Sequence, residues 1–325
     1  MTIRHPTRDT DILALVQTLG IEATRIVEYR HGIAARNFHI VCTDGTARVV
    51  RYDTRRMAAD IREDRMLGAL AVRNGINAPT GNWLIHELGN ATVVIRQHLA
   101  GTTLAELTPA TWPDARRLGQ VLRSIHEVPQ PAIARRFFYA PVLDTLDQQW
   151  QTIRDAVAGM ADTAELATLL RHAWQQFDHA AERETLRLSP TGLIHGDFTP
   201  ANILIHERGL TVLDWEKSCI GPVCADIAQS LYYCVSAHSS KIGTFATSFL
   251  EGYGKPDWYK PDLIKAWMTL HPAFILLTDA ANTFLNRRLP PPARHPNREA
   301  YFRDVSVPRY RAYLAHQRDL LSIVS

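Results

Sequence analysis

The stretch LIHGDFTPANILI, residues 193–205, places a histidine, an aspartate and an asparagine between two apolar runs. Short apolar runs bounded by turn residues are typical of buried strands. Polar side chains at such a position cost free energy unless they find a partner. We therefore predict two short strands that hold a rigid loop, and we expect this loop to present Asp197 and Asn202 to a ligand.

A second carboxylate is predicted to lie beside this loop. Residues 201–205 and 210–213 are mostly apolar and flank the turn ERG, so they predict a hairpin that returns Asp214 to the neighbourhood of Asn202. Glu216 follows two positions later and would share a strand face with Asp214. The segment thus supplies two acidic side chains and an amide close together.

This set of side chains suits phosphoryl transfer. That reaction needs a carboxylate to orient the acceptor hydroxyl and hard oxygen ligands to hold Mg²⁺ against phosphates. The protein-kinase loop H-R-D-x-x-x-x-N has the spacing of Asp197 and Asn202, with Gly196 here in place of the arginine. Asp-Trp-Glu stands where the kinase template has D-F-G. HGD alone could be an ordinary turn, but its link through a hairpin to D-x-E favours the functional interpretation.

Composition sets the broad class. The chain has 325 residues, of which 46% are hydrophobic and 21% charged, as in a globular protein of one large or two ordinary domains. A net charge of +3 is too small to predict nucleic-acid binding. The four cysteines have no metal or redox spacing, and we find no signal peptide and no apolar run long enough for a membrane span. We expect a cytoplasmic protein without a membrane or nucleic-acid partner.

The distribution of predicted elements indicates two lobes. Residues 24–52 predict strands with a hairpin at Asp44-Gly45, and 57–73 predict a helix. Residues 91–99 predict another strand. We place a nucleotide-binding lobe at residues 1–97 and a mostly helical catalytic and acceptor-binding lobe at 98–325. Helices are expected there at 112–127, over 141–187, and at about 262–287.

The motifs together resemble one family. LIHGDFTPANIL and VLDWEKSCIGPVCADIA resemble the aminoglycoside phosphotransferase and choline kinase family, whose fold is protein-kinase-like. RHGIAARNFHIVCTDGTARVVRY resembles its nucleotide-loop hairpin, REDRMLGALAVRNGINAP its helix with a glutamate, VVIRQHLAGTTL its hinge and LGQVLRSIHEV its helix ending in histidine. These segments follow the family's order over about residues 20–235. The resemblance implies an α+β, two-lobed, protein-kinase-like fold.

The resemblance also implies roles for individual residues. Asp197 would be the catalytic base or the group that orients the acceptor, and Asn202 and Asp214 would bind Mg²⁺, with Glu216 as a further candidate ligand. Asp226 would brace the catalytic loop. The residues expected to bind the nucleotide are Gly32, Arg36, Asn37, Arg51, Glu63, Gln97 and Leu99. Among them, Arg51 replaces the kinase lysine and Glu63 is its expected ion-pair partner, while residues 97–99 form the hinge. We expect His195 and His126 to be structural.

The implied reaction is transfer of the γ-phosphoryl group of ATP, with GTP as an open alternative, to a hydroxyl of a small molecule. An antibiotic-type, aminoglycoside-like or amino-sugar acceptor is favoured, and a choline- or thiamine-type amino alcohol is the alternative. A nucleotide-binding pseudokinase without turnover is the rival from another class. Candidate carboxylates for a cationic acceptor are Glu251, Asp257, Asp262, Asp279 and Glu299, and Trp258 and Tyr259 could contribute to an aromatic cage.

Overall fold

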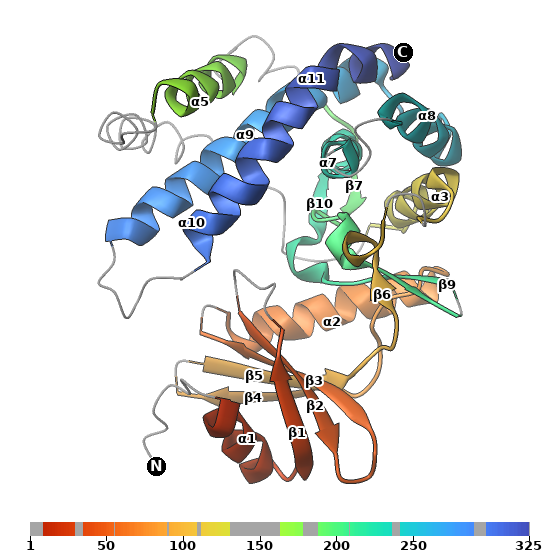
Figure 1. Ribbon diagram of the computed structural model, residues 1–325. Coiled ribbons are helices and arrows are strands. Elements are labelled where there is room, and N and C mark those ends of the chain that lie inside the picture. Colours follow the sequence, from red (N-terminus) through yellow and green to blue (C-terminus); the bar gives the residue numbers. More distant parts are fainter. Residues whose placement is uncertain are drawn as a thin grey trace.

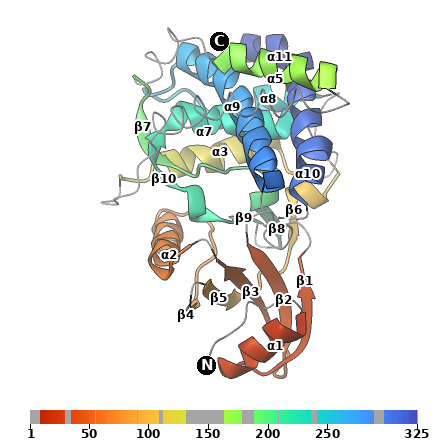
Figure 2. The same ribbon diagram turned by 90° about the vertical axis from the view of Figure 1, so that its left-hand side faces the viewer.

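The computed structural model describes residues 9–29, 35–54, 56–89, 91–108, 112–130, 163–177, 188–207, 209–235, 241–288 and 297–324. These residues form a β-sheet lobe at one end of the molecule and a helical lobe at the other (Figure 1). Helix α2 lies between the sheet and the helical lobe (Figures 1 and 2). The predicted α+β, two-lobed fold is confirmed. The division of the chain between residues 97 and 98 stays a prediction.

The first lobe is built on a five-stranded antiparallel sheet in the order β1-β2-β3-β5-β4. Its strands are β1 (Ala23–Glu28), β2 (Arg36–Cys42), β3 (Ala47–Asp53), β4 (Leu84–Leu88) and β5 (Ala91–Gln97). Two helices accompany it, α1 (Asp9–Thr18) and α2 (Ala58–Arg73). The hairpin around Asp44-Gly45 and the helix after it are therefore as predicted, whereas α1 and β4 are additional.

The alternation of side chains gives this sheet one apolar face, which packs in the core, and an opposite face where charged, polar and apolar side chains are mixed. Phe38, Val50 and Ile95 are paired neighbours on three strands, and all are buried in a core that α1 completes with Ile12 and Val16. The opposite face carries Asn37 and Arg51, which are also directly paired across β2 and β3. Because successive side chains in a strand point to opposite faces, a well-packed core on one side fixes the polar residues on the other.

The second lobe holds the larger core. Its helices are α3 (Ala115–His126), α5 (Thr163–Phe177), α7 (Val223–Val235), α8 (Ile242–Tyr253), α9 (Pro261–Arg288), α10 (Arg298–Tyr301) and α11 (Val307–Ile323). A π-helical turn, Phe302–Ser306, joins α10 to α11. Across the described residues, no helix combines the length and apolar character needed to cross a bilayer.

The second lobe also contains two small antiparallel sheets. One pairs β7 (Thr191–Ile194) with β10 (Cys219–Pro222). The other has the order β6-β8-β9, with β6 at Thr102–Thr103, β8 at Ile203–His206 and β9 at Gly209–Val212. The predicted hairpin within 201–213 is confirmed by the β8–β9 pairing.

Helices α3 and α8 approach so closely that their backbones touch at glycines. A Cβ atom added to Gly252 would lie 1.9 Å from the carbonyl oxygen of Arg116, and one added to Gly119 would lie 1.9 Å from that of Phe249. Real Cβ atoms do not approach a carbonyl oxygen so closely, so a side chain at either position must move the helices apart.

We predict that Gly252→Ala lowers the free energy of unfolding by about 2 kcal/mol or more, because overpacking strains the α3–α8 contact. Gly243→Ala, in the same helix, is the matched control, since its Cβ would meet only Ile323 Cδ1 at 3.8 Å. The control is expected to change stability by less than about 1 kcal/mol and in the favourable direction. Urea unfolding of both variants checks this, and equal stability of the two would contradict it.

A second prediction concerns His271, which is buried in α9 between the rings of Trp267 and Phe274, and neither of its ring nitrogens has a hydrogen-bond partner among the residues that the structure describes. Burial lowers the pKa of His271 to about 4. The unfolded chain takes up this proton near pH 6.5, so acidification favours unfolding between pH 6.5 and 4, by roughly 3 kcal/mol in total. His271→Leu should remove most of this acid loss, as measured by urea unfolding at pH 7 and pH 4.5. His316→Leu should keep it, and the same acid loss in both variants would refute the assignment.

Candidate active site

One buried carboxylate braces the loop that carries Asp197. Asp226, in the first turn of α7, accepts hydrogen bonds from the backbone N–H groups of His195 (2.8 Å) and Gly196 (3.0 Å). His126 Nε2 is 3.1 Å from the same carboxylate, and Tyr253 Oη is 2.7 Å from His126 Nδ1. Burial alone would raise the pKa of Asp226, but the hydrogen bonds from His126 and from the backbone of His195 hold it below its usual range. The predicted bracing role of Asp226 and structural role of His126 are confirmed.

His195 connects this loop to the neighbouring strand through backbone groups. Its Nε2 is 2.9 Å from the carbonyl oxygen of Leu213, and its Nδ1 is 3.3 Å from the backbone nitrogen of Asp197. A neutral imidazole that donates from Nε2 and accepts at Nδ1 satisfies both contacts. Burial lowers the pKa of His195, which favours this neutral form. The expectation of a structural histidine is confirmed.

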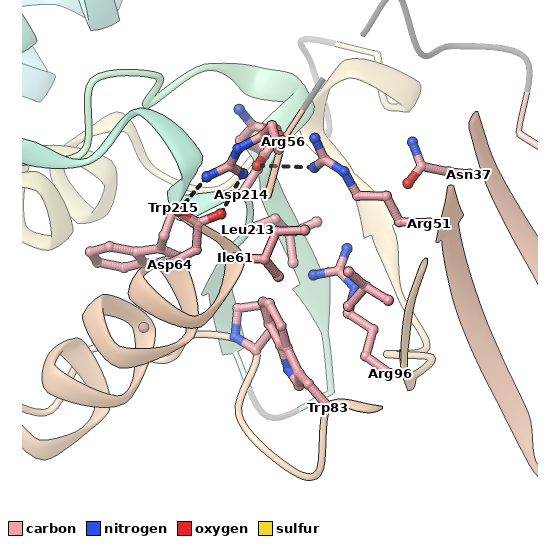
Figure 3. Close-up of a pocket in the computed structure, with 14 residues that line it drawn as sticks. Asn37, Arg51, Arg56, Ile61, Asp64, Trp83, Arg96, Leu213, Asp214 and Trp215 are labelled. Carbon is pink, nitrogen blue, oxygen red and sulfur yellow. Dashed lines mark hydrogen bonds and ion pairs between the residues drawn. The ribbon is translucent and has the colours of Figure 1, made fainter. Parts of the chain in front are cut away.

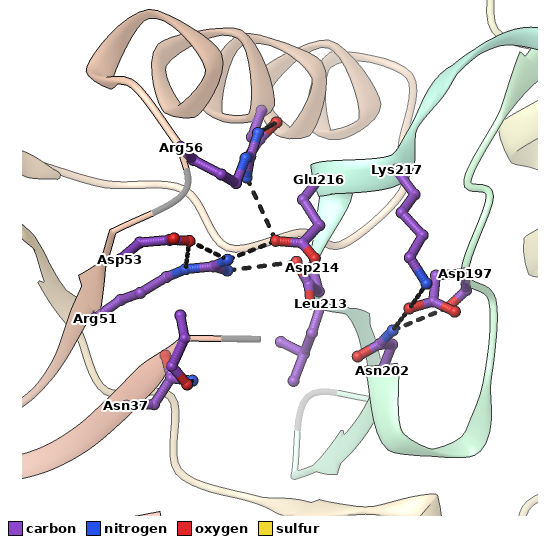
Figure 4. A network of polar contacts seen from close by, with 12 residues as sticks. Asn37, Arg51, Asp53, Arg56, Asp197, Asn202, Leu213, Asp214, Glu216 and Lys217 are labelled. Carbon is purple, nitrogen blue, oxygen red and sulfur yellow. Dashed lines mark hydrogen bonds and ion pairs between the residues drawn. The ribbon is translucent and has the colours of Figure 1, made fainter. Parts of the chain in front are cut away.

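Asp197 and Asn202 lie together on the loop, as their spacing predicts. Asn202 Nδ2 donates to the carbonyl oxygen of Asp197 (3.0 Å) and to its Oδ2 (3.1 Å). Lys217 Nζ approaches Oδ2 from the other side, at 3.2 Å (Figure 4). Partial removal of water lowers the pKa of Lys217, although 54% of the side chain is exposed, but the carboxylates of Asp197, Asp214 and Glu216 outweigh this effect and raise it. The Asn202 amide oxygen is not used in these bonds and can face a cation.

The hairpin brings Asp214 to this loop. The backbone N–H of Leu213 donates to the carbonyl oxygen of Asn202 at 2.7 Å, so the residue next to Asp214 is tied to the proposed metal ligand. Asp214 has a left-handed backbone, with φ 56° and ψ 74°, which aspartate tolerates better than most residues. Burial and the neighbouring Glu216 raise the pKa of Asp214. A divalent cation would stabilise its ionised form, and carboxylate and amide oxygens are hard ligands suited to Mg²⁺.

Arg51 is the centre of a charged network that crosses from the sheet to the Asp214 segment. Its Nη2 is 2.8 Å from Asp53 Oδ2 and 2.6 Å from Glu216 Oε2, and its Nη1 is 3.9 Å from Asp214 Oδ1 (Figure 4). Arg56 contacts Glu216 at 3.4 Å and pairs with Asp64 of α2 at 2.5 Å. A planar guanidinium can hold two carboxylates at once, which the lysine of the kinase template could not do in the same way.

The expected partner of Arg51 on α2 is therefore corrected. Glu63 was predicted to form that ion pair, but Arg51 pairs with Asp53 and Glu216 instead. The helix carboxylate that joins the network is Asp64, through Arg56. Asp64 is buried on the face of α2 that also carries Ile61 and Leu67, whereas Glu63 is only partly buried. Helical periodicity turns the two carboxylates to different sides, so the one-residue offset changes the partner.

Other predicted nucleotide contacts have different outcomes. Gly32 lies outside the described residues. Arg36 forms a two-pronged ion pair with Glu28, Nε–Oε1 and Nη2–Oε2 both 2.8 Å, and its guanidinium lies over Phe38 at 4.9 Å. A phosphate would therefore have to displace Glu28 to recruit Arg36. Asn37 faces the space between the lobes and lines both cavities described next.

Two adjoining cavities occupy the region between the lobes. The larger, about 530 Å³, has Val49 from β3 on one side, Leu204 and Leu213 on the other, and the segment with Gln97 and Leu99 at its rim. The smaller, about 150 Å³, is lined by Arg51, Arg56, Arg96 and Asp214, among others (Figure 3). Arg96 also lies against Trp83, 5.5 Å from the ring centroid. A large apolar slot that opens onto a cationic recess suits a ligand with a flat ring and an anionic tail.

The proposed metal site is only partly built from protein. Within the described segments, no three His, Cys, Asp or Glu side chains converge as a ready metal cage. Mg²⁺ is commonly held by one or two carboxylates and completed by phosphates and water, so Asn202 and Asp214 fit that pattern. Glu216, a candidate third ligand, has its Oε2 bound by Arg51 and Arg56. That pairing makes Glu216 an anchor for Arg51 in this structure.

Several charged members of the site were missed from the sequence: Asp53, Asp64, Arg96 and Lys217. Asp53 had a usable signal, since it is two positions after Arg51 and hence on the same strand face. Lys217 had a weaker one, because it directly follows D-W-E. Arg56 belongs to an arginine-rich segment, residues 48–65, which the sequence marks as either a solvated face or an anion site. Arg96 depends on tertiary packing, which no local pattern in the sequence encodes.

We predict that the Arg51–Glu216 pair contributes a coupling free energy of about 1.5 kcal/mol or more to unfolding, since both side chains are largely buried, 19% and 17% exposed. A double-mutant cycle with Arg51→Met and Glu216→Gln measures it. The matched control is the pair Arg116–Glu251, whose side chains are 51% and 50% exposed. Its coupling should stay below about 0.5–1 kcal/mol. Similar coupling in both cycles would contradict a buried network.

Comparisons with solved structures agree with this architecture. An amicoumacin kinase, hAmiN, in complex with AMP-PNP and Ca²⁺, is 14% identical and has a TM-score of 0.59 over 92% of this chain and 93% of that one. A thermostable mutant of aminoglycoside phosphotransferase APH(4)-Ia with AMP-PNP and hygromycin B is 17% identical, with a TM-score of 0.60 over 92% and 97%. The macrolide 2′-phosphotransferase MphH from Brachybacterium faecium is 22% identical, with a TM-score of 0.55 over 92% and 97%. These likenesses show the fold.

Sequence comparison gives the family. No curated protein matches the chain. A model of the phosphotransferase enzyme family, APH, matches residues 25–264, which is nearly three quarters of the chain and includes the catalytic loop, the Asp214 segment and the Arg51 strand. The chain therefore belongs to the phosphotransferase enzyme family, as the motifs predict.

Proposed function

We propose that this protein transfers the γ-phosphoryl group of ATP or GTP to a hydroxyl group of a small molecule. The observation that carries the proposal is the braced loop on which Asp197 and Asn202 lie side by side, joined by a backbone hydrogen bond to the strand end before Asp214. Family membership supports a phosphotransferase, and the spacing of these three residues supports the kinase arrangement.

The two cavities suggest how a nucleotide would bind. Its base would lie between Val49 and the pair Leu204 and Leu213, with the backbone of residues 97–99 at its edge. Its phosphates would extend toward Arg51 and the recess beside Asp214. Mg²⁺ held by Asn202 and Asp214 would neutralise charge that develops on the phosphates. Arg51, held by Asp53 and Glu216, is positioned to contact the phosphates from the sheet side.

Asp197 is the group proposed to act on the acceptor. Its carboxylate is 17% exposed and lies at the end of the network away from Arg51 (Figure 4). A hydroxyl that donates a hydrogen bond to Asp197 would be oriented for in-line attack, and the carboxylate could receive its proton. Asn202 holds Asp197 in place through one hydrogen bond to its carboxylate and one to its backbone carbonyl oxygen.

We propose an antibiotic-type or amino-sugar acceptor. Structures with the same fold contain hygromycin B or belong to macrolide and amicoumacin phosphotransferases, which supports this class by analogy. Of the candidate carboxylates, Asp279 is partly buried and accepts a hydrogen bond from Ser306. Burial raises the pKa of Asp279, and nearby cations, Lys217 among them, oppose this effect. Glu251 and Glu299 are instead paired with Arg116 and Arg287.

The choline-type alternative is supported less well by the aromatic residues considered for it. Tyr259 is buried and donates to the carbonyl oxygen of Val324. Trp258 donates from Nε1 to the hydroxyl of Tyr253 at 3.1 Å. Both rings are thus part of the packing between α8, α9 and the C-terminal helix, and they do not form an open cage for a quaternary ammonium ion.

We predict that Asp197→Asn lowers kcat by at least about 10³-fold while changing the affinity for Mg²⁺-nucleotide by no more than a few-fold, because the carboxylate acts on the acceptor. Mg²⁺-dependent release of ADP and GDP is measured across aminoglycosides, macrolides, peptide and nucleoside antibiotics, amino alcohols and hexosamines. Asp319→Asn, an exposed carboxylate on α11, is the control and should behave as the wild type.

The same assay separates the rival functions. Full turnover by Asp197→Asn on the best acceptor would refute the proposed mechanism. Nucleotide binding without turnover on any acceptor would favour a pseudokinase. Labelling of generic protein substrates by radioactive ATP, with no small molecule phosphorylated, would favour a protein kinase.

A further inference from the structure

We propose that Lys217 is a catalytic residue of this transfer, whose ammonium group binds the phosphoryl group in transit beside the carboxylate of Asp197. The inference rests on the proposed function, because it assigns a residue to the same reaction. Its starting point is the ion pair of Lys217 Nζ with Asp197 Oδ2, at 3.2 Å. Lys217 follows the D-W-E segment and is 20 positions from Asp197 along the chain, so the fold and not the local sequence brings the two together.

The backbone fixes the place of Lys217 relative to the catalytic loop. β7 and β10 are antiparallel with Ile194 opposite Cys219, and continuing this register puts Gly196 opposite Lys217. The contact is tight, since a Cβ atom on Gly196 would lie 2.5 Å from the carbonyl oxygen of Lys217. The hydroxyl of Ser218 also donates to the carbonyl oxygen of His195 at 3.0 Å. The base of the lysine side chain is therefore held next to Asp197.

The end of the side chain, by contrast, can exchange partners. The Lys217 side chain is 54% exposed, whereas that of Asp197 is 17% exposed. Exposed ion pairs are weak because water and salt compete with them. A lysine on a flexible four-carbon stem can leave one oxygen of Asp197 for a nearby phosphoryl oxygen without any change in the backbone. Asp197 is then free to accept the hydrogen bond of the acceptor hydroxyl.

The distribution of cations gives Lys217 a separate task from Arg51. Arg51 and Arg56 lie on the sheet side of Asp214, where Asp53, Glu216 and Asp64 hold them. Lys217 lies on the other side, with Asp197 (Figure 4). A phosphoryl group passing from nucleotide to acceptor would have arginine charge on the nucleotide side and Lys217 on the acceptor side. Cations so placed stabilise the charge on the transferred oxygens in the transition state.

The reaction step balances without any further reagent. The acceptor oxygen forms a bond to the γ-phosphorus, and the bond from that phosphorus to the β–γ bridging oxygen breaks. The nucleoside diphosphate leaves with the electron pair of the broken bond, and the acceptor proton passes to Asp197 and then to solvent. Lys217 keeps its proton throughout, since its role is that of a cation and a hydrogen-bond donor.

The first experiment compares Lys217→Met, Lys217→Arg and a control, Lys241→Met, in Mg²⁺-dependent turnover on the best acceptor. Lys241 is exposed at the start of α8, a helix that packs on α3 and α11. Lys217→Met should lower kcat by about 10²-fold, as expected for loss of one transition-state donor. Lys217→Arg keeps the charge and should exceed Lys217→Met by at least about fivefold. The control should match the wild type.

The second experiment separates contact with the phosphoryl group from an effect that acts only through Asp197. In an Asp197→Asn background, Lys217→Met should lower the residual rate by a further tenfold or so, whereas a residue that only positions Asp197 would have no added effect. Calorimetry should show that Lys217→Met weakens binding of Mg²⁺-AMP-PNP or Mg²⁺-GMP-PNP severalfold but leaves Mg²⁺-ADP or Mg²⁺-GDP within about twofold.

Each outcome decides the proposal. An unchanged or increased kcat in Lys217→Met would overturn the proposal. An increase would show that Lys217 only blocks access of the acceptor to Asp197. Equal losses in the methionine and arginine variants would also overturn it, as would the absence of any added effect in the Asp197→Asn background. If the wild-type protein is active and Lys217→Met is equally active, only the role of Lys217 is refuted. A wild-type protein that binds no nucleotide would remove the proposed function as well.

Discussion

The buried carboxylate of Asp226 is the contact on which the remainder of the site depends. It receives two backbone N–H groups of the catalytic loop and the side chain of His126, and it is 1% exposed. A buried charge is tolerated only when hydrogen bonds replace the water that it has lost. The three donors meet this requirement and, in doing so, connect α7, α3 and the loop. Asp197 is therefore presented from a backbone that has little freedom to move.

From that anchor, a series of short contacts reaches the sheet lobe. His195 bonds to the carbonyl oxygen of Leu213, and Leu213 bonds back to Asn202, so the loop and the Asp214 segment are held together twice. Glu216 then extends to Arg51 and Arg56, which belong to the other lobe. The site thus spans both lobes through one continuous set of hydrogen bonds and ion pairs. The proposed nucleotide and metal contacts are at its middle, where the charges are most crowded.

The sequence predicted the parts of this arrangement that local spacing determines. The proximity of Asp197, Asn202 and Asp214 was predicted from the spacing within one loop and one hairpin. The turn at Asp44-Gly45 was predicted because Asp-Gly favours the backbone conformation of a tight hairpin turn. The two-lobed fold could therefore be inferred in outline. The partner of Arg51 could not be predicted, because it depends on which of two adjacent acidic residues on α2 faces inward and on how the two lobes contact each other. Helix α1 and strand β4 were missed since their apolar patterns are weak and short. Lys217 was missed because its partner is determined by the β7–β10 register.

The most direct test of this account is the effect of Mg²⁺ on nucleotide binding, since the central claim is that Asn202 and Asp214 hold one metal ion against the phosphates. Calorimetric titration with AMP-PNP and GMP-PNP, each with and without Mg²⁺, measures it. We expect Mg²⁺ to increase the affinity for at least one analogue by about tenfold or more, a gain of roughly 1.4 kcal/mol. We expect Asp214→Asn to abolish that gain. Equal affinity with and without Mg²⁺ in the wild-type protein, or a full Mg²⁺ effect in Asp214→Asn, would contradict the account.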